Sequence, residues 1–373
     1  MSAFARNDTS LLSSWWWTVD RWTVAALALL IGVGVLLTLA ASPPVADRLG
    51  YDSFHFVRRQ AAFLPLALVV LGAVSMMAPR GVRRLAVAGF VVALALLMAT
   101  FFLGTEIKGA RRWIELAGIS LQPSEFIKPT FAVISAWLFA AAAEGGMPGG
   151  RRAAIALFAL VVGLLLLQPD MGMAVVVSMV WFTQFFLAGL PLVWGALCAA
   201  LGVAGLVGAY FLLPHVASRI DRFIDPSSGD SYQIRRSMEA FTNGGAVGRG
   251  PGEGTVKEVL PDAHTDFIFA VAGEEFGLFV CLFIVGLFAV VVLRGFARIL
   301  QENNLFIILA ATGLLVQFGL QAVVNMASTL HLMPTKGMTL PFISYGGSSL
   351  LSVALGMGMV LALTRRRMGG KAV

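Results

Sequence analysis

Asp266 is the residue of this sequence best placed for acid–base chemistry, because a long polar loop ends there and an apolar segment begins. The local sequence is His264-Thr265-Asp266-Phe267, and most of the chain from Phe267 to Leu293 is apolar enough to lie in hydrocarbon. A carboxylate at such a boundary is partly desolvated yet reachable from water, and a charge at the edge of a membrane helix points first to function. If the substrate is anchored in a membrane, Asp266 can serve as its general base.

A structural role for Asp266 is the alternative. Aspartate often caps a helix N-terminus, where its side chain accepts hydrogen bonds from backbone N–H groups. The helix dipole would also keep the carboxylate ionised and ready to accept a proton, so capping and catalysis are compatible. The sequence leaves both interpretations open, and the adjacent His264 and Thr265 are candidates for substrate contacts.

Two further pairs of charged residues interrupt apolar segments. Glu274 and Glu275 follow Asp266, and Glu274 would project from the same helix face as Asp266, about 12 Å deeper at the α-helical rise. Glu125 and Lys128 are spaced i, i+3 at the start of another apolar segment, so they share a helix face. Charges at membrane depth must face protein, water or a partner charge. Each pair could therefore line a substrate cavity or hold helices together.

Basic residues in three loops are candidates for binding phosphate, because the guanidinium group matches the geometry of phosphate oxygens. The candidates are Arg111 in loop 104–124, Arg219 and Arg235 in loop 214–265, and Lys336 in loop 326–341. The alternative is a solvated surface or contact with anionic lipid headgroups. Ser344 lies in a run of small residues that permits close approach of a neighbouring helix or a ligand.

Composition indicates which class of protein must position these residues. The chain has 373 residues, of which 58% are hydrophobic and 13% charged, whereas soluble domains carry roughly 25% charge. The apolar residues fall into runs of about 20, the length that crosses a bilayer. The pattern predicts an all-α polytopic membrane protein, with no nucleic-acid partner implied by the net charge of +7. Cys198 and Cys281 lie in apolar runs and suggest neither a disulfide nor a metal site.

The sequence predicts about ten membrane helices. Their ranges are 23–42, 60–78, 84–103, 125–143, 152–168, 171–189, 191–213, 266–293, 304–325 and 342–363. Arginine-rich short loops place both termini in the cytoplasm by the positive-inside rule. The expected organisation is a cytoplasmic tail (1–22), one membrane domain (23–363) with a large extracytoplasmic loop (214–265), and a second cytoplasmic tail (364–373).

The large loop has its own internal pattern. Ser231 to Thr242 has the apolar spacing of a helix, and the glycine-rich stretch from Gly244 to Gly254 must be irregular and is expected to be flexible. In the turn between two predicted helices, Asp170 is expected to cap the second one. No internal repeat suggests the inverted halves of a transporter.

Several motifs in order along the chain resemble the shape, elongation, division and sporulation (SEDS) family. The motifs are Gly109 to Ile114, Gln122-Pro123-Ser124-Glu125 with Lys128, Gln168-Pro169-Asp170, Asp225-Pro226, Tyr232-Gln233, His264 to Ile268 with Gly273-Glu274-Glu275, and Pro341 to Ser348. Within the family, Pro334 to Gly337 followed by Leu340 to Ser349 is more similar to the cell-division members than to the elongation members. The chain departs from common forms at Asp262 and His331.

The resemblance implies a peptidoglycan glycosyltransferase that polymerises lipid II into β-1,4 glycan strands at the outer face of the bacterial inner membrane, at the division septum. Asp266 matches the family's essential aspartate, and Glu125 and Lys128 match its functionally important glutamate and lysine on the fourth helix. The leaving group would be undecaprenyl pyrophosphate, neutralised by basic side chains or by a divalent cation, Mg or Mn. The implied partners are a class B penicillin-binding transpeptidase and other membrane proteins of the division machinery.

Two other functions fit the same sequence. A lipid II flippase would use the intramembrane acids Glu125, Glu274 and Glu275 along a transport path. A scaffold without chemistry of its own would use the large loop only to dock a transpeptidase. The absence of visible repeats and the position of the polar residues at the outer face favour the enzyme.

Overall fold

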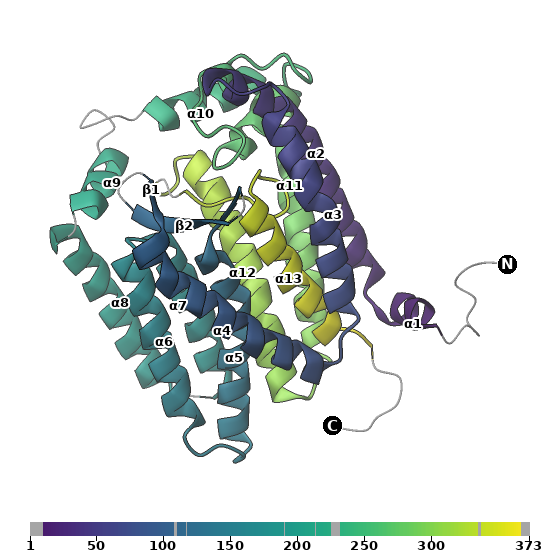
Figure 1. Ribbon diagram of the computed structural model, residues 1–373, viewed down its shortest axis with the longest axis vertical. Coiled ribbons are helices and arrows are strands. Elements are labelled where there is room, and N and C mark those ends of the chain that lie inside the picture. The colour runs from purple at the N-terminus through teal and green to yellow at the C-terminus, as the bar shows by residue number, and fades with distance from the viewer. Residues whose placement is uncertain are drawn as a thin grey trace.

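The computed structural model describes residues 10–107, 110–116, 118–189, 191–212, 214–224, 232–334 and 337–366, most of them in helices that lie side by side (Figure 1). Within this part, seven helices are long and apolar enough to cross a membrane. They are α2 (Arg21–Arg48), α3 (His55–Ser75), α4 (Pro79–Leu103), α5 (Pro123–Ala143), α6 (Gly150–Leu167), α11 (Ile268–Ile299) and α12 (Leu305–Thr329). The predicted multi-pass, helical membrane fold is confirmed.

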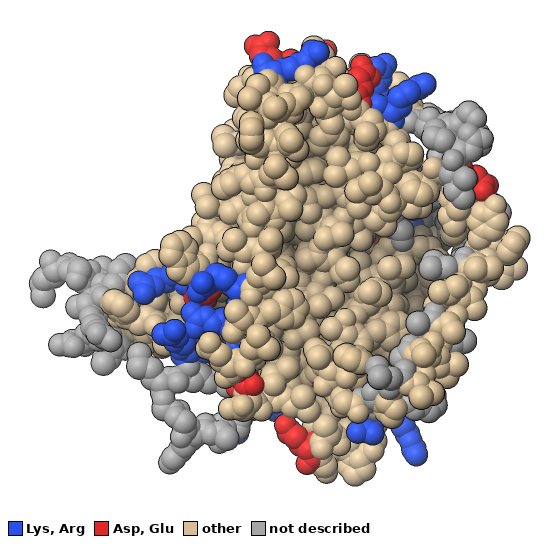
Figure 2. Space-filling view, turned by 180° about the vertical axis from the view of Figure 1, so that it is seen from behind, with Lys and Arg blue, Asp and Glu red and all other residues tan. Residues whose placement is uncertain are grey.

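Three more apolar helices occupy the remaining predicted ranges: α7 (Met171–Leu187), α8 (Leu192–Leu212) and α13 (Gly347–Leu363). Each of the ten predicted segments thus falls on a helix, although the number of spans and the cytoplasmic position of the termini stay predictions. Figure 2 shows a broad face with few charged side chains between charged groups at its two ends, which fits a surface in contact with lipid.

The bundle is organised around α5 and α12, whose residues are mostly buried. α5 packs against α4, α12, α6, α7 and α13, and α12 also packs against α7 and α11. Polar side chains on these two helices therefore face protein and are shielded from lipid. This arrangement satisfies the requirement that intramembrane charges face the bundle interior.

Several helix boundaries differ from the prediction by a few residues, and for two of them the hydrogen bonds and ion pairs give the physical reason. α13 begins at Gly347, five residues later than predicted, because the preceding residues are hydrogen-bonded to the turn before α11. α11 extends to Ile299, and its last turns place Arg294 and Arg298 beside the buried Asp20. Burial raises the pKa of Asp20, but hydrogen bonds from Arg294, Thr23 and Arg298 outweigh burial and hold it below its usual value.

Several elements were not predicted from the sequence. A short helix, α1 (Leu11–Thr18), lies in the predicted N-terminal tail, and α9 (Pro214–Ile224) opens the large loop. The loop after α4 forms an antiparallel sheet of β1 (Thr105–Ile107), β2 (Ala110–Leu116) and β3 (Ile119–Leu121). The predicted helix in the large loop is confirmed as α10 (Tyr232–Gly244) and is followed by a short 3₁₀ turn, η1 (Val256–Glu258). α9, α10 and the sheet lie at one end of the bundle (Figure 1).

Candidate functional site

α11 is broken near its start by Gly277, whose φ of 75° and ψ of −171° are not helical. The break frees backbone groups that a continuous helix would pair internally. The carbonyl oxygen of Glu274 accepts a hydrogen bond from the backbone N–H of Arg249 at 3.0 Å, and Leu278 donates to the carbonyl of Gly245 at 3.0 Å. The large loop is thus bonded to the kink of the helix that follows Asp266.

The glycine-rich segment is therefore ordered where the sequence suggested flexibility. A Cβ atom on Gly248 would lie 2.2 Å from the carbonyl oxygen of Glu275, a separation that no side chain tolerates. The segment is irregular, as predicted, but the glycines serve close approach to α11. Their effect is to fix the large loop against the helix.

Glu274 and Glu275 are fully buried beneath this segment. One carboxylate oxygen of Glu274 accepts hydrogen bonds from the backbone N–H groups of Thr255 and Val256, each at 3.0 Å. Glu275 forms a short ion pair with the ammonium group of Lys257. These contacts support the structural interpretation of both acids, in which they hold η1 against α11.

Asp266 lies in a turn immediately before α11 and is half-buried. The N-cap residue of α11 is Phe267. Asp266 precedes it by one position and is therefore not the N-cap that the structural interpretation predicted. The backbone carbonyl of Asp266 accepts a hydrogen bond from Asn325 Nδ2 at 2.9 Å, and the same nitrogen donates to the carbonyl of Met338 at 2.6 Å. A Cβ atom on Gly337 would lie 3.1 Å from Asp266 Oδ2, so the Gly337 backbone faces the carboxylate.

A second set of contacts joins the same two segments. Ser344 is buried, accepts a hydrogen bond from the backbone N–H of Leu340 at 2.7 Å and donates its own proton to the carbonyl of Thr265 at 2.6 Å. The backbone N–H of Tyr345 donates to the carbonyl of His264 at 2.9 Å. The tertiary structure thus brings the predicted residues His264, Thr265, Asp266 and Ser344 together.

The ring of His264 is buried between two aromatic rings, with centroids 4.4 Å from Phe56 and 5.2 Å from Tyr345. Burial lowers the pKa of His264 to about 4, while the charge of Asp262 opposes the shift and that of Arg48 adds to it. The imidazole is therefore neutral at pH 7. Among the described residues, its buried Nδ1 atom has no hydrogen-bond partner.

Glu125 and Lys128 form a buried ion pair on α5, with 2.9 Å between Glu125 Oε2 and Lys128 Nζ. Lys128 Nζ also donates a hydrogen bond to Gln321 Oε1 on α12 at 2.9 Å. The amide nitrogen of Gln321 then donates to the carbonyl of Thr339 at 3.1 Å. The ion pair is thereby connected to the segment that passes beside Asp266.

The predicted phosphate-binding residues are more dispersed. Arg111 lies on β2, half exposed, with its Nε 3.5 Å from Glu106 Oε2, and Arg235 is exposed on α10. Lys336 lies outside the described residues, as does the side chain of Arg219. Asp170 accepts a hydrogen bond from the backbone N–H of Met173 at 3.3 Å, which confirms it as the cap of α7.

The described side chains also bear on the predicted metal. In the part of the chain that the structure describes, no three or more histidines, cysteines, aspartates or glutamates lie close enough to hold a metal ion together. The described carboxylates thus do not form a metal site by themselves, and a divalent cation at this site stays a prediction. Basic side chains are the alternative source of the positive charge that a bound phosphate group would need.

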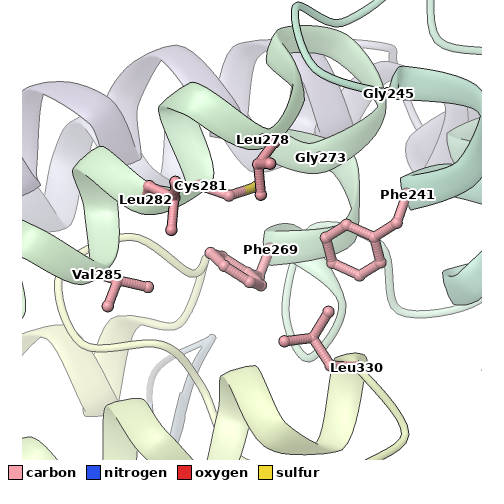
Figure 3. A pocket seen from close by; sticks show the side chains of 9 residues that line it. All are labelled: Phe241, Gly245, Phe269, Gly273, Leu278, Cys281, Leu282, Val285 and Leu330. Carbon is pink, nitrogen blue, oxygen red and sulfur yellow. The ribbon is translucent and has the colours of Figure 1, made fainter.

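An apolar cavity of about 370 Å³ lies beside the kink of α11 (Figure 3). Phe269, three residues after Asp266, and Phe241 of α10 face the cavity together with Leu330 at the end of α12. Leu278 and Leu282 line it from beyond the kink and are each more than half exposed. The cavity therefore opens through the surface of membrane-spanning helices and is suited to an apolar chain.

Asn325 and Gln321 were missed by reasoning from the sequence. Their signal was present, because Gln317, Gln321 and Asn325 recur every four residues in an otherwise apolar helix and so share one face. What the pattern did not show is their partners, which lie on segments distant in the sequence.

Comparison with known proteins identifies a family and several relatives that this chain resembles. Residues 21–368 match the family of FtsW, RodA and SpoVE, described as "cell cycle protein". A probable peptidoglycan glycosyltransferase FtsW from Caulobacter vibrioides is 46% identical over 368 residues, covering 98% of this chain and 94% of that protein. A protein of the same name from Coxiella burnetii is 36% identical over 361 residues, covering 93% of this chain and 96% of that one.

Solved structures show the same arrangement. A chain from a peptidoglycan synthase complex, studied for the coordination of polymerization and crosslinking, has a TM-score of 0.73 at 29% identity, covering 93% of this chain and 97% of that one. The rod shape determining protein RodA from Thermus thermophilus has a TM-score of 0.69 at 29% identity, covering 94% of this chain and 97% of that one. The predicted family is confirmed, and the relatives named FtsW agree with the predicted likeness to cell-division members.

Proposed function

Because this chain belongs to the SEDS family of FtsW, RodA and SpoVE, we propose that it is a peptidoglycan glycosyltransferase that polymerises lipid II, with Asp266 as its general base. The names of the relatives support the predicted class of enzyme, a glycosyltransferase. The observation that carries the proposal for Asp266 is its placement. The residue is half-buried just before a membrane helix, and its backbone carbonyl accepts a hydrogen bond from Asn325 on α12.

The proposed reaction is a single displacement. Asp266 accepts the proton of the 4-hydroxyl group of N-acetylglucosamine on the acceptor lipid II, and the hydroxyl oxygen forms a bond to the anomeric carbon of the growing chain. The bond from that carbon to undecaprenyl pyrophosphate breaks, and one inversion gives the β-1,4 linkage. An aspartate with an ordinary pKa of about 3.9 is a weak base for a sugar hydroxyl. Proton transfer therefore comes late, when departure of the pyrophosphate and bonding to the anomeric carbon have placed positive charge on the hydroxyl oxygen and made its proton acidic.

The departing pyrophosphate requires positive charge. We assign this role to basic residues of the outer loops, among them Arg111, Arg219, Arg235 and Lys336, because guanidinium and ammonium groups stabilise phosphate oxygens directly. Three or more described carboxylates do not gather into a metal site, so a Mg or Mn ion would need oxygens of the pyrophosphate in addition to any one or two carboxylates.

The apolar cavity beside α11 supports a lipid-linked substrate. Its volume of about 370 Å³ and its lining by Phe241, Phe269 and Leu330 suit part of a polyprenyl chain. Because Phe269 is three residues from Asp266, a chain held there would keep the attached sugar near the proposed base. The apolar lining can accept such a tail from the bilayer without burying an unpaired polar group.

The structural neighbour from a peptidoglycan synthase complex supports a partner that performs crosslinking. We propose a class B penicillin-binding transpeptidase for this role, with other membrane proteins of the division machinery. The chain would then work in the bacterial inner membrane at the division septum, where glycan polymerisation and crosslinking proceed together.

The decisive experiment compares the full-length chain with its Asp266→Asn variant, alone and with a co-expressed transpeptidase whose own active-site serine is replaced. We expect the wild type to convert lipid II to glycan strands and the variant to bind lipid II without polymerising it. Strand formation by Asp266→Asn would remove Asp266 as the base. If the wild type forms no glycan under either condition, a flippase assay in vesicles tests the transport alternative, and failure of both assays leaves a scaffold.

A further inference from the structure

Resting on the proposed function, we infer that Asn325 is the positioning residue for Asp266. One amide nitrogen of Asn325 donates to the backbone carbonyls of Asp266 and Met338, at 2.9 and 2.6 Å. The first carbonyl belongs to the proposed base and the second to the residue after Gly337, whose backbone faces the carboxylate. A single side chain therefore fixes the base and the segment beside it relative to each other.

The turn around Asp266 needs such a support. Asp266 precedes the N-cap of α11 and so lies in the turn outside the regular helix. Asn325 supplies the support from α12, a central and largely buried helix, and is itself only 1% exposed. A side chain locked by burial on a rigid helix can hold a reactive group in one geometry more accurately than a loop can.

The chemistry of asparagine suits this position. Its amide nitrogen carries two N–H donors, which match two carbonyl acceptors. An aspartate of the same shape supplies at most one donor, and leucine supplies none. One turn earlier on α12, Gln321 donates to the carbonyl of Thr339, so α12 holds the segment beside Asp266 at a second point.

Loss of this support should affect the reaction rather than substrate binding. Without the two hydrogen bonds the turn would relax, and a displacement of about 1 Å in a catalytic group costs about 100-fold in rate. Because neither amide hydrogen bond goes to the substrate, we expect kcat to fall while the KM for lipid II stays within about twofold.

The test measures kcat and the KM for lipid II in the Asn325→Leu variant of the full-length chain, under the conditions used for the wild type. The matched control is Gln184→Leu, because Gln184 is also a fully buried amide that bridges two backbone carbonyls, those of Ala132 at 2.7 Å and Leu309 at 3.2 Å. Thermal unfolding of each variant measures the structural cost. If Asn325→Leu fails to fold, Asn325→Asp provides a variant of the same shape with fewer donors.

We expect Asn325→Leu to lose about 100-fold in kcat, Asn325→Asp to lose kcat as well because an ionised carboxylate donates to neither carbonyl, and Gln184→Leu to retain the kcat of the wild type per folded molecule. Equal kcat in Asn325→Leu and Gln184→Leu would overturn the inference while leaving the proposed function intact. An inactive wild type, or an active Asp266→Asn, would instead overturn the proposed function.

Discussion

Lys128 and Gln321, which are 193 positions apart in the sequence, are joined by a hydrogen bond of 2.9 Å in the interior of the bundle. The same ammonium group lies 2.9 Å from Glu125, and the side chains of Lys128 and Glu125 are 1% and 5% exposed. This placement makes Lys128 the junction between the ion pair of α5 and the amide face of α12. Its removal therefore affects both helices.

We predict that Lys128→Met destabilises the protein by about 3–5 kcal/mol, because it leaves the carboxylate of Glu125 buried without its cation. Thermal unfolding in detergent measures the loss. The double variant Glu125→Gln with Lys128→Met should recover most of the stability, since it removes the uncompensated charge. A double variant less stable than the single one would contradict this account.

The kink of α11 provides a prediction with a control in the same helix. Gly277→Ala should destabilise the fold, because the residue has a positive φ and the new Cβ would lie 2.4 Å from the backbone nitrogen of Gly248. Gly286→Ala should be neutral or stabilising by about 0.5–1 kcal/mol, since its Cβ meets nothing within 4 Å. The free energy of unfolding and the rate of proteolysis of residues 244–258 both test the prediction. Equal behaviour of the two variants would refute it.

Glu274→Gln tests whether Glu274 holds η1. Glutamine keeps one oxygen for the hydrogen bonds from Thr255 and Val256, but it has no negative charge. Its NH₂ group would face the backbone N–H of Lys257, which donates to the second carboxylate oxygen of Glu274. We expect a loss of about 1–3 kcal/mol in stability. The matched control is Glu253→Gln, since Glu253 is exposed and nearby. If Glu274→Gln unfolds at the same temperature as the control, the carboxylate does not support the turn.

His264 should make the free energy of unfolding depend on pH. Its pKa is lowered from 6.5 to about 4 in the folded chain, so between these values the unfolded chain binds a proton that the folded chain does not. The contribution of neutral His264 is therefore complete above pH 6.5 and is lost as the pH falls toward 4, by up to about 3 kcal/mol. His264→Phe keeps a ring between Phe56 and Tyr345 and removes the proton-binding site.

Unfolding temperatures of the wild type and His264→Phe at pH 7.5 and pH 5 give the measurement. The wild type should lose more stability than the variant on acidification, because all other titrating groups are shared. An identical loss in both proteins would show that His264 does not contribute.

The sequence alone determined the class of fold and the position of the proposed base. Runs of about 20 apolar residues are a sufficient signal for membrane helices, because the bilayer fixes their length. The boundary between loop and helix at Asp266 is likewise a local property of composition. The start of α13 and the sheet of β1, β2 and β3 were not predicted, because both depend on hydrogen bonds between separate segments.

Only the tertiary structure decided which polar residues act together. Glu274 lies in α11, the helix that follows Asp266. Its side chain nevertheless accepts hydrogen bonds from backbone N–H groups of Thr255 and Val256, at the start of η1. Asn325, distant in sequence, holds the carbonyl of Asp266. A hydrogen bond is specified by the distance and direction between two groups, and for residues far apart in the chain both are set by helix packing. The periodicity of one helix shows which side chains share a face, but not what that face meets.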